Sequence, residues 1–514
     1  MLMPRFHDGI HHIFVLALEN RSFDHVFGAD PSLRGTFDPT WLTSVIGQNQ
    51  IVTPGLSVSG QQVPDQMNFD PPHEYLNVFQ QLSSSVPGSI SNFDPNKWVE
   101  AIQTGYLAAN KTVPSDCFDS IRMLLPDQTS VLGTLARQYA LCTAWHASVP
   151  SSTWPNRFFF HAASSAGFFD GPSSDQAVIS EIFDGFSFSG KTVYHELGID
   201  SDNWRIFYGG PMVPQVYSLE GMTPDHLARN YSNLSSFLEE VSKPDYSAAY
   251  TFIEPNYGNF INYLGGNSQH SLGSFKAGEA LVRYIYESLR NSPIWRDSLL
   301  IITYDEHGGF YDHVIPPNCV SPGGKDYYRS MSQSYGAPIA KDLTAISAMP
   351  GTGTVWPTSC AFTQLGFRVP AVIISPYISA GTRISTVFDH SSIPKTLAIQ
   401  YGLSTLSNRG EAANHLLDAS IVSPAAVQAV DETDQWSFPA SAPSGSPSWN
   451  ETIGFDVPIP AGPVSGSARA FAMLQLRPHW QNQTLSFGDI TNRVNSIRGA
   501  ITMKDMDQVL SSLP

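Results

Sequence analysis

Four oxygen-bearing side chains stand directly after two mainly apolar segments of this chain. The segments are residues 12–18 and 299–304, and the side chains that follow them are Glu19, Asn20, Asp305 and Glu306. Neighbouring carboxylates repel each other and are costly to desolvate, and a bound cation relieves both effects. Carboxylate and amide oxygens together suit a divalent cation. The alternative interpretation is that each acid caps a following turn or helix.

The two apolar segments must be neighbouring strands if these side chains are to meet. Unbroken hydrophobic runs are typical of strands buried in a parallel sheet, and α/β sheets bind ligands at the carboxyl ends of their strands. Because both segments end alike, the pattern favours a shared metal site over two separate caps. Oxygen ligands suit Ca²⁺, Mg²⁺ or Mn²⁺, and nearby histidines would admit Zn²⁺, so the identity of the metal stays open.

A hydroxyl at the start of a predicted helix is the candidate nucleophile. Thr153 opens the pattern T-x-P-x-R with Pro155 and Arg157, directly before an apolar stretch that can be helical. Proline is tolerated in the first turn, where free N–H groups and the helix dipole form an anion site. Sulfatases place their nucleophile precursor at the first position of the similar pattern C/S-x-P-x-R. A hydroxyl activated by a metal can attack phosphorus, whereas the simpler alternative is a plain N-cap threonine.

Four histidines lie in segments that could face the same ligand. They are His73 in a Pro-rich loop, His270 before a predicted helix, His313 after the acid pair and His390 at another helix start. Taken singly, each is more often a surface or capping residue. His73, in its rigid loop, could point at a ligand.

The rest of the chain has the pattern of an α/β protein without internal repeats. Helical spacing predicts helices at about 129–141 and 275–290, and apolar runs predict further strands at 249–254 and 370–375. A helix at 275–290 followed by a strand at 299–304 is one half of a βαβ unit.

Loop-rich stretches set the expected domain boundaries. Residues 316–358 are rich in Pro, Gly and Ser and should overhang the site as a lid or wall. The expected division is a catalytic domain at 1–431, a Pro/Ser-rich linker or surface wrap at 432–467, and a C-terminal extension at 468–514. A terminal helix is possible at 503–510.

The composition argues against several classes of protein. The chain has 514 residues, 42% of them hydrophobic, which allows a large core. A net charge of −17 and the lack of any Lys/Arg run argue against nucleic-acid binding. No run of about 18 apolar residues occurs, so no transmembrane helix is expected. The N-terminus lacks the apolar core of a secretory signal, which leaves a cytoplasmic protein or a secreted or periplasmic one whose leader was removed.

The cysteines are too far apart to predict a thiolate metal site. No C-x-x-C pair occurs among Cys117, Cys142, Cys319 and Cys360. Two disulfides and four buried thiols are both compatible with the sequence, and the oligomeric state stays open.

Four motifs resemble those of the bacterial phospholipase C and acid phosphatase phosphoesterase family, in the expected order over about 10–405. They are Glu19-Asn20-Arg21-Ser22-Phe23-Asp24-His25-Val26-Phe27-Gly28, Thr153-Trp154-Pro155-Asn156-Arg157, Asp305-Glu306-His307-Gly308-Gly309-Phe310-Tyr311-Asp312-His313 and Arg368-Val369-Pro370-Ala371-Val372-Ile373-Ile374-Ser375-Pro376. The resemblance implies the alkaline phosphatase superfamily fold, an α/β fold with a central mixed, mostly parallel sheet flanked by helices.

The resemblance also implies roles for the candidate residues. A metal would be held by Glu19, Asn20, Asp305 and Glu306, with Thr153 as nucleophile and additional ligand. His73 and His270 match family positions that contact phosphate or protonate the leaving group. His390 sits in a D-H-S-S stretch like the family's D-H-T-S and would belong to the same site, whereas His313 could instead orient the loop that carries the acids. Many relatives carry Gly-Pro before the nucleophile and His after it, whereas this chain has Ser151-Ser152 and Trp154. This departure leaves the substrate open, and Trp154 could stack on a leaving group or a quaternary amine.

The expected function is metal-dependent hydrolysis of phosphoric esters through a threonine nucleophile. Phospholipase C action on phosphatidylcholine-like lipids is the first choice, and a broad-specificity acid phosphatase acting on phosphomonoesters is the runner-up. A non-catalytic ligand-binding protein on the same fold is the alternative from another class. Neither G-x-S-x-G nor G-x-G-x-x-G occurs, so a nucleophile-elbow hydrolase or a dinucleotide enzyme has no support.

Overall fold

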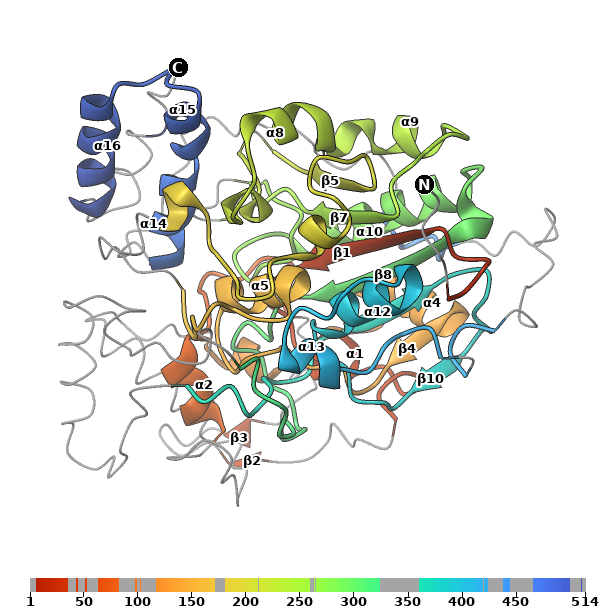
Figure 1. Ribbon diagram of the computed structural model, residues 1–514. Helices are drawn as coiled ribbons and strands as arrows, with labels where there is room; N and C mark the ends of the chain where they lie inside the picture. Colours follow the sequence, from red (N-terminus) through yellow and green to blue (C-terminus); the bar gives the residue numbers. More distant parts are fainter. Residues whose placement is uncertain are drawn as a thin grey trace.

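A central sheet with helices on both faces organises the molecule (Figure 1). The structure is a computed structural model. It describes residues 6–35, 63–82, 117–171, 181–210, 212–258, 265–323, 360–418, 420–423, 438–443 and 466–499, with short pieces at 43–44, 51–52, 98, 102, 263 and 510.

The main sheet has eight strands in the order β10-β4-β9-β8-β1-β7-β5-β6. Their bounds are β1 His12–Leu18, β4 Ala140–Cys142, β5 Trp204–Tyr208, β6 Tyr231–Asn233, β7 Tyr250–Glu254, β8 Ser298–Tyr304, β9 Ala371–Ile374 and β10 Thr382–Ile384. Within this sheet β9 runs antiparallel to β8 and β4, and the other pairings are parallel. The mixed, mostly parallel α/β fold class is therefore confirmed. A separate antiparallel pair joins β2 (Thr43–Ser44) and β3 (Ile51–Val52).

The two strands expected to carry the acids lie side by side at the centre of the sheet. β1 and β8 pair in parallel over their whole length, with Leu18 opposite Tyr304. Every residue of both strands is buried, as the unbroken hydrophobic runs predicted. The last residues of the two strands are thus in register, so the polar residues that follow leave the same edge of the sheet.

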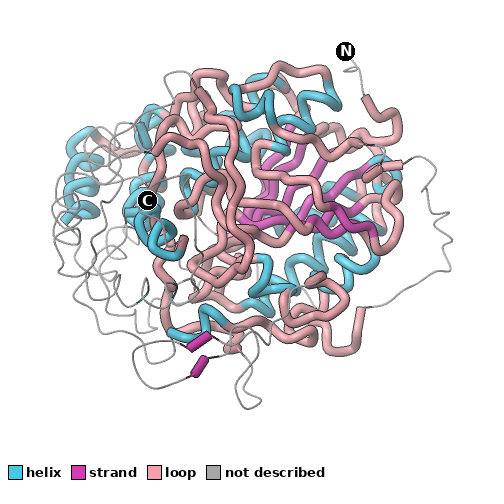
Figure 2. The backbone as a smooth tube through the Cα atoms, turned by 90° about the horizontal axis from the view of Figure 1, so that it is seen from below, coloured by secondary structure: helices cyan, strands magenta, loops and turns pink. Residues whose placement is uncertain are grey.

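Helices cover both faces of this sheet, as Figure 2 shows from a second direction. On one face, Phe160 of α5 packs against Phe252 of β7. On the other, Phe237 of α9 contacts Phe14 of β1. The helices are α1 Phe23–Phe27, α2 Tyr75–Gln81, α4 Leu132–Gln138, α5 Thr153–Ala162, α7 Val193–Glu196, α8 Pro224–Asn230, α9 Phe237–Val241, α10 Phe275–Arg290, α12 Ser392–Tyr401, α13 Asn408–Ala412, α14 Gly466–Leu474, α15 Arg477–Gln481 and α16 Phe487–Gly499.

The strongest periodic patterns gave the most accurate predictions. α10 has the predicted bounds, with Leu281, Val282, Ile285 and Leu289 buried on one face. The predicted helix at 129–141 is wrong at its C-terminal end, because α4 ends at Gln138 and Ala140–Cys142 forms β4 between β9 and β10. Pairing with two neighbours there outweighs the helical spacing of the sequence.

The C-terminal helices pack against the main core. Buried residues of α14 and α16, among them Phe471, Leu474, Ile490 and Ile497, belong to the same hydrophobic cluster as the strands. Most of the predicted overhanging loop at 316–358, most of 432–467 and the predicted helix at 503–510 lie outside the described residues, so those predictions and the domain division stay predictions. Among the described helices, none combines the length and hydrophobicity needed to cross a bilayer.

Candidate active site

The carboxyl ends of β1 and β8 bring the predicted acidic residues together. The backbone N–H of Asn20 donates to Asp305 Oδ1 at 3.0 Å, which joins the segments after the two strands. Asn20 has a left-handed backbone (φ 57°), a conformation that asparagine tolerates better than most residues. Gly308 (φ 64°) lies so close that a Cβ there would stand 2.4 Å from the Asn20 carbonyl oxygen. The glycine of the Asp305–Gly309 motif is thus required for the two segments to meet.

Four buried side-chain oxygens in this cluster accept no hydrogen bond from the described residues. They are Glu19 Oε1 and Oε2, Asn20 Oδ1 and Glu306 Oε1. The Ser268 side chain lies near Glu19 and favours its charged form. Unpaired buried carboxylate oxygens are strongly unfavourable, and hard cations take such oxygens as ligands. These residues therefore fit a divalent cation by the chemistry of their donors.

Burial changes the ionisation of these acids. It raises the pKa of Glu19 to about 8, with Arg157 opposing the shift and Asp305 adding to it. Burial also raises the pKa of Asp305, and it raises the pKa of Glu306 well above its ordinary range although His73 opposes this. A cation is the kind of partner that would keep this group of acids ionised at neutral pH.

Asp305 differs from its neighbours because the protein satisfies it. Its Oδ1 accepts from the N–H groups of Asn20 and Glu306, at 3.0 and 2.8 Å. Its Oδ2 accepts from Nε of Arg157 at 3.0 Å. Three donors hold this carboxylate in one orientation, which would fix the geometry of a ligand.

Helix α5 carries Thr153 to the same edge of the sheet. Thr153 is the first residue of α5, after the N-cap Ser152, and is 6% exposed. Arg157 lies one turn later on the same face of the helix and makes the contact with Asp305. Figure 1 shows the arrowhead of β1 pointing toward α5. Arg157 of this helix therefore contacts the acidic cluster, and Thr153 with its free N–H groups begins the same helix one turn earlier.

Two of the predicted histidines face the cluster and share an acid. His73 Nε2 lies 3.3 Å from Asn20 Nδ2 and 3.7 Å from Glu306 Oε1, while its Nδ1 is 2.6 Å from the Pro71 carbonyl oxygen. Asp70 Oδ1 stands 4.0 Å from Nδ1 of His73 and 3.6 Å from Nε2 of His270. The ring of His270 stacks on Tyr263 at 3.5 Å.

The two histidines differ in charge. Burial opposes the charged form of His73, but Glu306, Asp70 and Glu74 outweigh it and raise its pKa to about 10. Burial, with the charges of His73 and Arg21, holds the pKa of His270 well below its ordinary value. The neighbouring carboxylates thus favour the protonated form of His73, whereas burial favours the neutral form of His270.

His390 contacts the backbone of the cluster and not its side-chain oxygens. Its Nε2 lies 2.6 Å from the Asp305 carbonyl oxygen, and its Nδ1 accepts from Trp145 Nε1 at 3.3 Å. Burial lowers its pKa to about 4. A neutral imidazole with both nitrogens engaged holds Asp305 in place, and this geometry leaves no ring nitrogen to face a substrate.

His313 belongs to a second, separate acidic group. Ligand atoms of Asp24, Asp312 and His313 lie within 4.8 Å of one another, close enough to hold a metal ion. Arg368 donates to Asp24 Oδ1 at 2.8 Å and to Asp312 Oδ1 at 3.0 Å. The guanidinium supplies the positive charge there, so His313 ties the loop after the acid pair to α1, the second of the two predicted possibilities.

The structure decides two further points that the sequence left open. The proposal that Trp154 stacks on a ligand is wrong, because Trp154 is fully buried and packs on Phe471 (4.9 Å) and Phe186 (5.9 Å). The four cysteines are free thiols, so no disulfide forms among them.

Three residues of the site were not predicted. Glu254 ends β7, the other neighbour of β1, and its carboxylate lies 3.8 Å from Nη1 of Arg157. The signal was present, because strand 249–254 ends in an acid as the other two strands do. Arg157 stands inside the T-x-P-x-R pattern and Asp70 lies just before His73, but no spacing rule pairs Arg157 with Asp305 or Asp70 with His270, 148 and 200 positions away.

The chain belongs to the Phosphoesterase family, whose family model matches residues 10–404. This membership makes it a phosphoric ester hydrolase and confirms the resemblance seen in the motifs.

Two relatives illustrate the similarity. Non-specific phospholipase C6 of Arabidopsis thaliana is 28% identical over 404 residues, covering 76% of this chain and 68% of its own. Phospholipase C A of Mycobacterium tuberculosis (strain H37Rv) is 27% identical over 419 residues, covering 77% of this chain and 73% of its own.

Solved structures resemble the chain only slightly. Murine ectonucleotide pyrophosphatase/phosphodiesterase 5 matches with a TM-score of 0.35 and 10% identity, over 56% of this chain and 96% of its own. An alkaline phosphatase superfamily protein from Vibrio parahaemolyticus gives a TM-score of 0.28 and 13% identity, over 53% of this chain and 59% of its own.

Proposed function

We propose that the protein is a metal-dependent phospholipase C that releases diacylglycerol from phosphatidylcholine-like lipids, with Thr153 as its nucleophile. The observation that supports this proposal is the set of four buried oxygens without hydrogen bonds on Glu19, Asn20 and Glu306, next to Asp305, which the helix beginning at Thr153 contacts through Arg157. Glu19, Asn20, Asp305 and Glu306 would hold the cation, with the Thr153 hydroxyl as a further ligand.

The cation would supply charge that stabilises the phosphoryl oxygens and lowers the pKa of the Thr153 hydroxyl. The chain's own groups do the rest. Arg157 stays charged between Asp305 and Glu254 and fixes the orientation of Asp305. The free N–H groups at the start of α5 donate to the oxygens of the bound phosphate.

The proposed reaction has two displacements at phosphorus. In the first, the Thr153 hydroxyl releases its proton to solvent, and Thr153 Oγ forms a bond to phosphorus while the bond from phosphorus to the glycerol oxygen breaks. The departing diacylglycerol oxygen would take a proton from His73, whose protonated form Glu306 and Asp70 favour, and His73 would regain a proton from the water consumed in the second. In the second, a water oxygen attacks phosphorus, Thr153 Oγ leaves and is reprotonated, and the phosphorylated headgroup departs.

His270 and Asp70 position the proton donor in this scheme. The N–H of Leu272 donates to His270 Nδ1 at 3.2 Å, so the neutral ring carries its hydrogen on Nε2, toward Asp70. Asp70 also faces His73. His270 can therefore donate to a phosphoryl oxygen or to Asp70, while His390 keeps the Asp305 backbone in place.

The names of the relatives support the choice of substrate. Both sequence relatives described above are phospholipases C, from a plant and from a bacterium. A broad acid phosphatase would use the same chemistry on monoesters. The two are separated by measuring diacylglycerol release from phosphatidylcholine and phosphate release from p-nitrophenyl phosphate, each with and without chelator.

The test of the mechanism is Thr153→Ala, with Thr153→Ser as the matched control. Thr153→Ala should lose at least roughly a thousandfold in turnover, as removal of a nucleophile does, while keeping its melting temperature and its bound metal. Thr153→Ser retains a hydroxyl and should keep measurable activity. Elemental analysis should find a divalent metal in all three proteins, and chelation should abolish wild-type turnover.

Two results would contradict the proposal. Full activity of Thr153→Ala would remove the nucleophile from the scheme. A wild-type protein that binds lipid but contains no metal and hydrolyses neither substrate would be the non-catalytic binding protein instead.

A further inference from the structure

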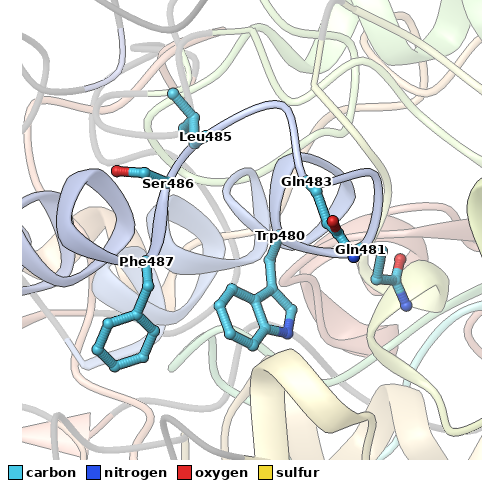
Figure 3. Close-up of a pocket in the computed structure, with 6 residues that line it drawn as sticks. All are labelled: Trp480, Gln481, Gln483, Leu485, Ser486 and Phe487. Atoms are coloured by element: carbon cyan, nitrogen blue, oxygen red, sulfur yellow. The ribbon is translucent and has the colours of Figure 1, made fainter.

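The turn between α15 and α16 presents two exposed aromatic side chains. Phe487 is 72% exposed, the largest value among the large hydrophobic side chains of the described chain, and Trp480 is 38% exposed. Their ring centroids are 6.0 Å apart. With Leu485 and the polar Gln481, Gln483 and Ser486 they line a surface hollow (Figure 3). We call residues 480–487 the aromatic turn.

The aromatic turn is held firmly in place. Ser486 and Asp489 form a reciprocal cap at the start of α16, with the Ser486 hydroxyl donating to Asp489 Oδ2 at 2.6 Å and the Asp489 N–H donating to Ser486 Oγ at 3.1 Å. The Thr484 N–H donates to the His479 carbonyl oxygen at 3.0 Å. Exposed aromatic rings on a rigid turn lose little conformational entropy when they are covered.

The base of the aromatic turn is anchored to the main domain. The Tyr217 hydroxyl donates to Gln481 Oε1 at 2.5 Å, and Gln481 Nε2 donates to the Met222 carbonyl oxygen at 3.1 Å. The buried Arg477 donates to the carbonyl oxygens of Tyr217 and Leu219. Any surface bound by the turn is therefore held at a fixed position relative to the sheet.

Contacts from this extension lead to the candidate active site. Phe471 of α14 packs on Trp154, the residue after the proposed nucleophile, with ring centroids 4.9 Å apart. It also packs on Tyr257 (5.8 Å), which donates a hydrogen bond to Glu254. In Figure 1, α14–α16 lie on the side to which the arrow of β1 points, which is the side of the acidic cluster.

The charge of the extension suits a phospholipid surface. The chain carries a net charge of −17, yet residues 466–499 contain three arginines besides the buried Arg477 (Arg469, Arg493 and Arg498) and one acid, Asp489. Asp489 is occupied by Ser486. Tryptophan and phenylalanine beside arginine, with little negative charge, are the residues found at the boundary between headgroups and acyl chains.

We propose that the aromatic turn inserts Trp480 and Phe487 into the headgroup–acyl boundary of a phospholipid bilayer and so seats the active site on its substrate. This inference rests on the proposed function, since it gives that function a means of reaching lipid held in a bilayer. The occupant of the surface is the bilayer itself, and no second protein is required.

The test is Phe487→Ser, with Leu238→Ser as the matched control. Leu238 is another exposed apolar side chain (47%), on α9, which Figure 1 places far from α16. Flotation with phosphatidylcholine vesicles should show Phe487→Ser binding at least about tenfold more weakly than wild type, the loss expected for one aromatic ring removed from an apolar environment. Phe487→Trp should bind at least as well as wild type, and Leu238→Ser should be unchanged.

Activity gives a second readout that does not depend on flotation. The ratio of turnover on vesicles to turnover on a monomeric, water-soluble phosphocholine ester should fall about tenfold in Phe487→Ser and stay constant in Leu238→Ser. Melting temperatures equal to wild type would establish that all variants fold.

Two outcomes would overturn the inference. Phe487→Ser could bind vesicles as the wild type does. Alternatively, sedimentation could reveal a wild-type oligomer that Phe487→Ser dissociates while neither protein binds vesicles, which would make the turn a contact between copies of this chain. If the wild type cleaves neither vesicles nor the soluble ester, the proposed function fails, while the flotation result still decides the role of the turn.

Discussion

Two buried acidic groups in this protein are built from the same pair of chain segments, yet they are completed in opposite ways. Both join the residues after β1 to the residues after β8. In the group of Asp24, Asp312 and His313, Arg368 donates to both carboxylates and closes the network. In the group of Glu19, Asn20 and Glu306, four oxygens accept no hydrogen bond from the described residues.

The difference teaches that clustered acids alone do not identify a metal site. The more compact of the two groups, with ligand atoms within 4.8 Å of one another, is the one that the protein neutralises itself. What distinguishes a candidate metal site is the absence of an internal partner, because natural proteins rarely bury an unsatisfied polar group without a function.

Removing one carboxylate from the group of Glu19, Asn20 and Glu306 should abolish activity without destabilising the fold. Glu19→Gln should lower turnover by at least roughly a thousandfold, because a ligand of the cation and its charge are lost. The metal-stripped variant should be at least as stable as metal-stripped wild type, because a buried carboxylate without hydrogen bonds has been replaced by a neutral amide. Turnover, metal content and chemical denaturation of the stripped proteins check this.

The same experiment can contradict the proposed difference between the two acidic groups. If metal-stripped Glu19→Gln were several kcal/mol less stable than wild type, Glu19 would have an internal partner, and the two acidic groups would not differ as described.

Removing the guanidinium of Arg368 from the group of Asp24, Asp312 and His313 should lower stability and leave metal binding unchanged. Arg368→Met should lower the free energy of unfolding by about 3 kcal/mol, because two buried carboxylates lose their partner. Bound metal per folded molecule should stay at the wild-type value. Denaturation with urea and elemental analysis of the folded fraction measure the two effects.

A double variant tests whether the lost stability comes from the unpaired carboxylates. Adding Asp312→Asn to Arg368→Met removes one of the stranded charges and should restore part of the lost stability. If Arg368→Met bound more metal than wild type, the group of Asp24, Asp312 and His313 would be a metal site that the Arg368 guanidinium occupies.

A third buried carboxylate, Glu279, accepts hydrogen bonds from the backbone and should affect neither turnover nor bound metal, only the pH dependence of stability. Its oxygens accept from the N–H groups of Val131 (2.6 Å) and Leu132 (3.2 Å) at the start of α4. Burial nevertheless raises its pKa to about 8, with these two hydrogen bonds opposing the shift. Because the folded protein binds the proton more tightly than the unfolded chain, stability should fall as the pH rises from about 4.5 to about 8.

Glu279→Gln should remove this dependence. The wild-type contribution is complete below the unfolded pKa and lost as pH rises through the folded pKa, with a slope of at most about 1.4 kcal/mol per pH unit. Urea denaturation of both proteins across this pH range measures the difference between their slopes. Equal slopes would mean that Glu279 is ionised in the folded protein throughout.

Local patterns sufficed for much of the fold. Strand β1 was predicted from an unbroken apolar run and α10 from its helical spacing, because in each case the pattern matches the burial that tertiary packing imposes. The short strands β5, β6 and β10 were not predicted. They have three to five residues each and are strands because of their neighbours in the sheet, which local sequence does not reveal.

The sequence by itself determined the fold class, the central strands and the types of residue available for chemistry at their ends. Which of these residues find an ion-pair or hydrogen-bond partner within the protein depends on the folded structure. It paired Arg157 with Asp305 and Glu254, gave Arg368 to the other acids, and buried Trp154 against Phe471. The physical reason is that the charge state and availability of a buried group depend on partners brought from distant parts of the chain, and the spacing of residues along the sequence carries no record of them.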